Sequence, residues 1–317
     1  MPRSLPRRRP LPVAMLFAAV ALVACSAGES VPRWDAKSVG ESIAGLPFTP
    51  VVVNSNLGVE RTRLALALLA TDQTLVPDAE VTLRLYRLAD NPEQDPSVAT
   101  AAGTFVLSAR SLDTGDGRPG SLQTMYTAMV DFDQAGSWGA DLDVKTNGRR
   151  YDGLRVTMAV QPHTSEPAVG DDAPRSRQKT LADTPNIAEL DSATPPNPGL
   201  HDVTVADAIA GGKPTLVAFV TPAFCQTRFC GPVLNNAVLP AWRTYGDRVQ
   251  FIHIEPYDLA AARRGAILLA PATEEWRLRA EPFIAVVDRH GKIATKLEGI
   301  IALDEVTEAL DAVLAAG

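Results

Sequence analysis

The chain contains only three cysteines among its 317 residues, and just 6% of it is aromatic. Three cysteines are too few for a scaffold built on disulfides, which needs several bridges. Acidic residues outnumber basic ones, and the resulting net charge of −7 argues against a protein that binds nucleic acid. The uninterrupted apolar stretch at residues 13–24 is too short to span a bilayer comfortably. What remains is an ordinary globular composition, 46% apolar and 21% charged, with room for about two domains.

The N-terminal segment has the layout of an export signal. Four arginines precede the apolar stretch and small residues follow it. The motif "LVAC" at residues 22–25 resembles a bacterial lipobox, which implies cleavage before Cys25 and lipid on its sulfur and amine. The alternative is a plain signal peptide with an incidental cysteine. We expect a signal peptide over residues 1–24, and a mature lipoprotein whose acyl chains anchor it to the bacterial cell membrane in the cell envelope, outside the cytoplasm.

The next part of the chain is predicted to be rich in strands. After a spacer at residues 25–48, apolar and polar residues alternate through much of 49–161, and turn-forming stretches interrupt the pattern. This favours an antiparallel β-sandwich, although "RLALALLA" at 63–70 suits a helix equally well. The stretch "YTAMVDFDQAGSWGADLDV" resembles the immunoglobulin-like, YtkA-like modules of exported bacterial proteins. We expect its carboxylates to form a solvated face; they are Asp131, Asp133, Asp141 and Asp143.

The region from 162 to 199 contains seven prolines and is predicted to be an extended linker. From residue 200 onward, strands and helices alternate. The apolar run "TLVAFV" at 215–220 is typical of a strand in the middle of a covered sheet. A helix at 232–245 should be kinked by Pro240. The remaining elements are predicted as a strand at 249–254, a helix at 272–279, a hairpin over 283–299 and a terminal helix at 302–314.

This order of elements resembles the thioredoxin fold over residues 200–317. Two motifs carry the resemblance: "CGP" opening a helix at 230–232, and "AEPFIAVVDRHGKI" at 280–293. Pro282, directly before a strand, matches the cis-proline that faces the thiols in that superfamily. The resemblance implies that Pro282 and the carbonyl of Glu281 flank a bound thiol substrate. The predicted fold is an α/β thioredoxin-like C-terminal domain behind an all-β immunoglobulin-like domain.

The cysteine motif departs from that family. In "TPAFCQTRFCGPV" four residues separate Cys225 from Cys230, whereas thioredoxins have two, and Val233 stands where their second cysteine would be. A spacing of five positions puts the two side chains on different faces of a regular helix. The pair can therefore meet only if 225–230 is a loop. Because the positive end of the following helix favours a thiolate, we predict that Cys230 is the more acidic thiol.

The residues available for proton transfer also differ from those of the family, because Ala218 stands where thioredoxins have a buried carboxylate. Aligned with the family, His253 lies near the position of a buried lysine that faces that carboxylate. His253, helped by Glu255, is a candidate proton acceptor, although a lone histidine on an apolar strand is more often a core residue. His201 begins the domain, and two further histidines, His163 and His290, are expected to be solvated.

Several functions suit this cysteine pair. The favoured hypothesis is a redox-active disulfide that exchanges with thiols and disulfides of exported proteins, without a cofactor. A Sco-like chaperone would instead bind Cu(I) through Cys225, Cys230 and His253. A structural bridge across so short a loop would add only about 2 kcal/mol of stability, and the chain would then be a non-catalytic adaptor. The β-rich module has no catalytic constellation and is expected to be a spacer or a partner-binding unit.

Overall fold

A computed structural model describes residues 34, 42–88, 100–115 and 121–316. These residues belong to one compact unit, Arg33–Gly317. The predicted signal peptide and the lipidated Cys25 lie outside the described residues, as does most of the predicted spacer. Within the described part of the chain, no helix is both long and apolar enough to cross a membrane.

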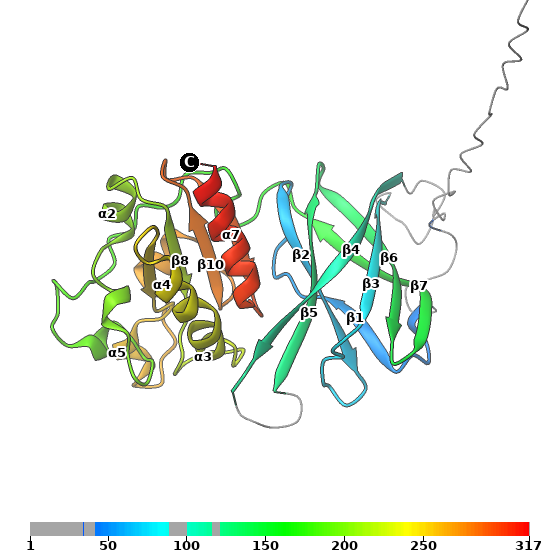
Figure 1. Cartoon of the computed structure of the whole chain (residues 1–317), viewed down its shortest axis with the longest axis horizontal. Helices are drawn as coiled ribbons and strands as arrows, with labels where there is room; N and C mark the ends of the chain where they lie inside the picture. Colours follow the sequence, from blue (N-terminus) through cyan, green and yellow to red (C-terminus); the bar gives the residue numbers. More distant parts are fainter. Residues whose placement is uncertain (1–33, 35–41, 89–99, 116–120, 317) are drawn as a thin grey trace, which may run out of the picture. The chain divides into compact units, whose positions relative to one another are not determined.

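An antiparallel sheet of seven strands fills residues 48–160 (Figure 1). The strand order is β1-β2-β5-β4-β3-β6-β7, and β1 also contacts β7, so the sheet nearly closes into a barrel. The strands are β1 (Phe48–Val52), β2 (Arg61–Ala70), β3 (Glu80–Arg87), β4 (Thr100–Asp113), β5 (Leu122–Asp131), β6 (Gly136–Thr146) and β7 (Arg149–Val160).

Alternating side chains build the core of this sheet. On β3, Val81, Leu83 and Leu85 are buried, and the residues between them are less so. The ambiguous stretch at 63–70 forms part of β2 and is buried along most of its length, so it is a strand that is covered on both sides. The antiparallel, strand-rich character expected for this region is confirmed, but the strands form one nearly closed sheet and not the predicted sandwich of two sheets, because β2 and β5 and also β3 and β4 pair edge to edge around it.

Two of the four aspartates expected on a solvated face are not solvated. Asp141 and Asp143 lie on β6, between β3 and β7, where Asp141 is only 3% exposed. Arg84, opposite Asp141 on β3, bonds Asp141 at 2.6 Å and Asp143 at 2.8 Å. The prediction was wrong for this pair because a cation on the neighbouring strand compensates their charge, and strand periodicity does not reveal such a partner. Asp131 and Asp133 are exposed, as predicted.

A second, four-stranded sheet follows, in the order β11-β10-β8-β9. Its strands β8 (Thr215–Phe219), β9 (Gln250–Ile254), β10 (Phe283–Val287) and β11 (Ile293–Glu298) are antiparallel, except that β8 and β9 are parallel. Helices pack against both faces: α2 (Val205–Ala210), α3 (Cys230–Val233), α4 (Leu239–Tyr245), α5 (Leu259–Ala262), α6 (Pro271–Glu275) and α7 (Leu303–Ala315). Strand β8 is buried at every position, as its apolar sequence predicts.

The helix predicted at 232–245 is interrupted. A π-helical turn, η4 (Leu234–Val238), separates α3 from α4, and Pro240 lies just inside α4. Proline has no N–H to donate to the preceding turn, so the hydrogen-bond register must change near it. The π-helical turn therefore produces the irregularity predicted for the helix at 232–245, and α3 is a short helix that begins at Cys230.

Residues 162–199, expected to be an extended linker, include a short 3-10 helix, η2 (Ile187–Glu189), and the start of a second one, η3 (Pro198–Leu200). Leu190 and Asp191 are buried, and the backbone N–H of Ser192 donates to Glu255 at 2.7 Å. The end of this segment therefore packs against the chain near β9.

A buried ion pair joins a strand of the first sheet to the last helix. Arg63 on β2 donates to both carboxylate oxygens of Glu305 on α7, at 2.6 and 2.9 Å, and to the carbonyl of Ile300 at 2.8 Å. Both charged side chains are at most 5% exposed. Since a buried guanidinium must have its donors satisfied, this contact holds distant parts of the sequence in one compact unit.

Replacing Arg84 tests the pairing between β3 and β6. Arg84→Met leaves the carboxylate of Asp141 buried without its closest cation, so the free energy of unfolding should fall by about 1–3 kcal/mol in urea titrations. The matched control is Lys145→Met, because Lys145 and its partner Glu80 are 57% and 77% exposed. That control should change stability by less than about 1 kcal/mol.

The same experiment has a defined pH dependence. The hydrogen bonds from Arg84 lower the pKa of Asp143 below its ordinary 3.8. The stabilisation from the pair of Arg84 and Asp143 is therefore fully present above about pH 4. It is lost as the pH falls through the pKa of Asp143 in the folded protein. Equal losses in Arg84→Met and Lys145→Met at neutral pH would contradict this account.

Candidate functional site

The two cysteines meet at the end of β8. A loop over residues 220–229 follows the strand and carries Cys225, and Cys230 is the first residue of α3. The loop is not helical, and Arg228 within it has a φ of 72°. The Sγ atoms of Cys225 and Cys230 lie 2.8 Å apart, and both are free thiols. The prediction that the pair meets only through a non-helical loop is confirmed.

The sulfur of Cys225 accepts hydrogen bonds from its surroundings. The Cys230 thiol contacts it, the backbone N–H of Cys230 donates to it at 3.2 Å, and the hydroxyl of Thr227 lies 3.3 Å away. These contacts, the thiol of Cys230 foremost, outweigh partial burial and lower the pKa of Cys225 to about 6. A half-buried Cys225 is therefore largely a thiolate at neutral pH.

Cys230 has the opposite character. Its side chain is fully buried, and burial, reinforced by the adjacent Cys225, raises its pKa far above the ordinary range. The prediction that Cys230 is the more acidic thiol was wrong. The first N–H of the helix points at the sulfur of Cys225, so the helix end stabilises charge on the loop cysteine instead.

Pro282 lies beside this loop. The Glu281–Pro282 peptide bond is cis, as predicted, and β10 begins directly after it. Glu281 holds the cysteine loop, because its carboxylate accepts from the N–H of Gln226 at 2.8 Å and its carbonyl accepts from the hydroxyl of Thr227 at 3.2 Å. Together with burial, Glu281 also raises the pKa of Tyr257. That Pro282 and Glu281 flank a substrate thiol remains a prediction.

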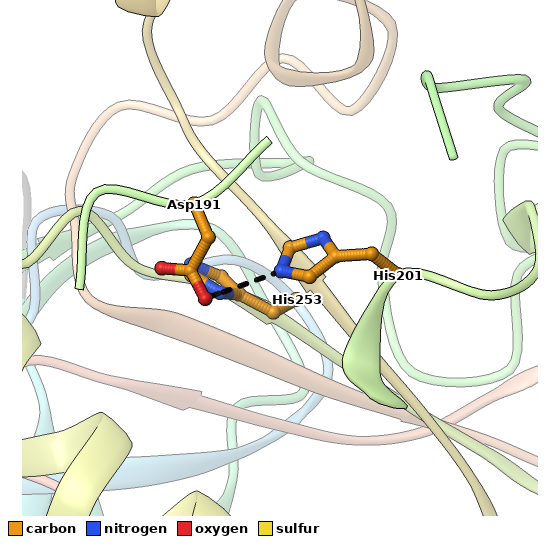
Figure 2. A group of neighbouring side chains, drawn as sticks. All are labelled: Asp191, His201 and His253. Carbon is orange, nitrogen blue, oxygen red and sulfur yellow. Dashed lines mark hydrogen bonds and ion pairs between the residues drawn. The ribbon is translucent and has the colours of Figure 1, made fainter. Parts of the chain in front are cut away.

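His253 belongs to a different cluster. It lies in the middle of β9, 1% exposed, with Asp191 and His201 as neighbours (Figure 2). In the described residues, the carboxylate that gathers with the thiols is Glu281. The set of Cys225, Cys230 and His253 proposed for copper is therefore not assembled.

Sequence reasoning missed Asp191. This residue lies in the proline-rich segment, where no periodicity marks a buried side chain, yet its carboxylate is fully buried. Burial alone would raise the pKa of Asp191, but bonds with His201 and His253 lower it strongly. Burial likewise opposes protonation of His253, and the carboxylates of Asp191 and Glu255 outweigh this and raise its pKa.

Comparisons with known proteins assign no family to this chain. No protein-family model matches the sequence. No curated protein matches it either. One solved structure, described as "MTB dsbF in its mixed oxidized and reduced forms", is 22% identical over 36% of this chain and 88% of that chain, with a TM-score of 0.27.

The unequal thiols predict selective alkylation. Iodoacetamide should modify Cys225 at a rate that rises with pH and is half-maximal near pH 6, because the pKa of Cys225 is about 6 and only the thiolate reacts. Cys230 should remain unmodified in the folded protein because it is buried. Mass spectrometry of peptides after timed labelling measures both rates.

The control is Cys230→Ala, which removes the thiol that contacts Cys225. In this variant, the pH at which Cys225 is labelled at half its maximal rate should move upward, toward the pKa of about 8.5 of an ordinary cysteine. Equal labelling of both cysteines in the wild-type protein, or no upward movement in the variant, would contradict the assigned asymmetry.

Proposed function

We propose that this chain is a thiol–disulfide oxidoreductase that acts on exported proteins. The observation that carries the proposal is the contact between two unlike thiols, a half-buried acidic Cys225 and a fully buried Cys230, 2.8 Å apart. A thiolate that solvent can reach is a nucleophile, and a protonated thiol behind it is a resolving group. Cys225 is therefore the attacking cysteine.

The reaction proceeds in two exchanges. The Cys225 thiolate attacks one sulfur of a partner disulfide, a mixed disulfide forms, and the other partner sulfur leaves with the electron pair and takes a proton from water. Cys230 then loses its proton and attacks the sulfur of Cys225. The intramolecular disulfide forms, and the first partner sulfur leaves as a thiolate. The partner gains two electrons, the pair loses two, and the reverse sequence oxidises a dithiol.

The surroundings favour this order of steps. The negative charge of Cys225 opposes ionisation of Cys230. Formation of the mixed disulfide removes that charge, so Cys230 becomes easier to ionise at the moment when its attack is required. The pair is already in contact, so the second step needs little movement of the loop.

The proposal includes the predicted domain organisation and the predicted location of the protein outside the cytoplasm. A thioredoxin-like domain over residues 200–317 is supported by the strand, cysteine loop and helix order and by the cis bond before Pro282. An immunoglobulin-like relationship for residues 49–161 rests on the sequence resemblance. Lipidation of Cys25 would tether the protein outside the cytoplasm, where thiols can remain oxidised.

Copper binding is the less favoured alternative. Cu(I) prefers soft ligands, and the carboxylate of Glu281, which gathers with the thiols, is a hard one. A purely structural bridge is also less favoured, because half of it is an acidic and partly accessible sulfur. Thiol–disulfide exchange uses both the acidity and the accessibility of this sulfur.

An insulin-reduction assay with dithiothreitol tests the exchange reaction. Cys225→Ser should fall to the background rate because the nucleophile is gone. Cys230→Ser should attack but fail to resolve, and should accumulate a mixed disulfide visible on a non-reducing gel. Cys25→Ser, which changes the cysteine outside this pair, should match the wild-type rate. Wild-type activity in both site variants would rule out the mechanism.

The reduction potential of the Cys225/Cys230 pair separates exchange from a structural bridge. Equilibration with glutathione buffers should give a value between about −120 and −270 mV, the range of exchange proteins. A value below about −300 mV, typical of structural bridges, would contradict the proposal.

A further inference from the structure

We propose that Asp191, His201 and His253 form a binding site for one divalent transition-metal ion such as Zn²⁺. The inference stands apart from the thiol chemistry, since it uses neither cysteine. The three residues come from different places in the chain: Asp191 follows η2, His201 follows η3, and His253 lies on β9. Figure 2 shows the carboxylate of Asp191 beside both rings. All three side chains are at most 3% exposed.

The spacing of the ligand atoms suits a shared ion better than direct hydrogen bonds. Oδ2 of Asp191 lies 3.4 Å from Nε2 of His201 and 3.7 Å from Nδ1 of His253. Good N–H···O bonds are about 2.7–3.2 Å long. Ligands about 2.0–2.2 Å from a tetrahedral zinc are about 3.3–3.5 Å from one another. One oxygen or nitrogen from each residue lies within 4.8 Å of the others.

The tautomer of His253 supports the same conclusion. Its Nε2 is 2.9 Å from the carbonyl of Val220, which can only accept, so Nε2 carries a hydrogen. In the neutral ring, Nδ1 then presents a lone pair toward the carboxylate of Asp191. Nδ1 is buried and has no hydrogen-bond partner. A cation beside Nδ1 would satisfy this atom, while Oδ2 of Asp191 accepts from the backbone N–H of Asn197 at 2.8 Å and keeps a lone pair for the ion. A ring N–H bonded to a backbone carbonyl is the usual support of a metal-binding histidine.

Charge balance also favours a divalent cation. Glu255 lies beside the cluster, 3.8 Å from His253, is 6% exposed, and has one buried oxygen without a hydrogen-bond partner. Among the described residues, the ion-pair contacts of Asp191 and Glu255 are to His201 and His253 alone. Histidines that bind a metal are neutral, so the two buried carboxylates would then carry two negative charges, which one divalent ion would neutralise.

The site has a route to solvent. A cavity of about 490 Å³ is lined in part by His201, His253 and Glu255, and it also reaches exposed residues such as Lys179 and Arg263. An ion can enter along this route, and a water molecule can complete the coordination as a fourth ligand.

Metal titration of the full chain tests the site. The parent protein carries Cys225→Ser and Cys230→Ser, so that the paired thiols cannot bind the ion. Isothermal titration with Zn²⁺, and elemental analysis after dialysis, should give one ion per chain. Asp191→Asn and His201→Gln should each weaken binding at least about tenfold. His290→Gln, at an exposed turn histidine, should bind like the parent.

A second measurement uses the parent alone, in case a site variant does not fold. The chain has four histidines. Zn²⁺ should shift the side-chain NMR signals of His201 and His253 and leave those of His163 and His290 unchanged. Failure of the parent to bind Zn²⁺ in a one-to-one ratio would overturn the proposal. So would shifts confined to His163 and His290, or unchanged affinity in folded Asp191→Asn and His201→Gln.

Discussion

The sulfur atoms of Cys225 and Cys230 lie 2.8 Å apart, and the difference between the two thiols depends on this contact, which a hydrogen bond from the backbone N–H of Cys230 supports. Two identical side chains five positions apart would otherwise be equivalent. The loop turns Cys225 back over the start of α3, so one sulfur receives the donors of the helix end while the other is enclosed by the core. The contact between the sulfurs and the unequal burial thus distinguish the two thiols, the first N–H of the helix adds to the difference, and sequence distance from the helix matters less.

The sheet explains why two polar clusters can lie close to an apolar core. Strands β8 and β9 are parallel and paired in register, with Ala218 opposite His253. The small side chain of Ala218 leaves room at that position, and the chain before α2 supplies a carboxylate there through Asp191. The carboxylate beside His253 therefore comes from a segment well before β8 in the sequence, and not from the sheet itself.

Local patterns predicted the framework well. The apolar run of β8, the period-two strands and the need for a loop between the cysteines all follow from short-range geometry. Three features did not follow. The acidity of Cys225 depends on its contact with the buried thiol of Cys230, the burial of Asp141 depends on Arg84 across the sheet, and Asp191 lies in a segment without periodicity. Each is fixed by a contact between residues whose relative position the sequence does not state.

The bond between His253 and the carbonyl of Val220 has a consequence for the thiols. The same amide group ends in the N–H of Thr221, and this N–H opposes the rise that burial causes in the pKa of Cys230. A positive charge on the imidazole draws electron density toward the carbonyl oxygen, and this strengthens the N–H as a donor. One peptide group therefore lies between the ring of His253 and the surroundings of the Cys230 sulfur, although the two residues belong to separate clusters.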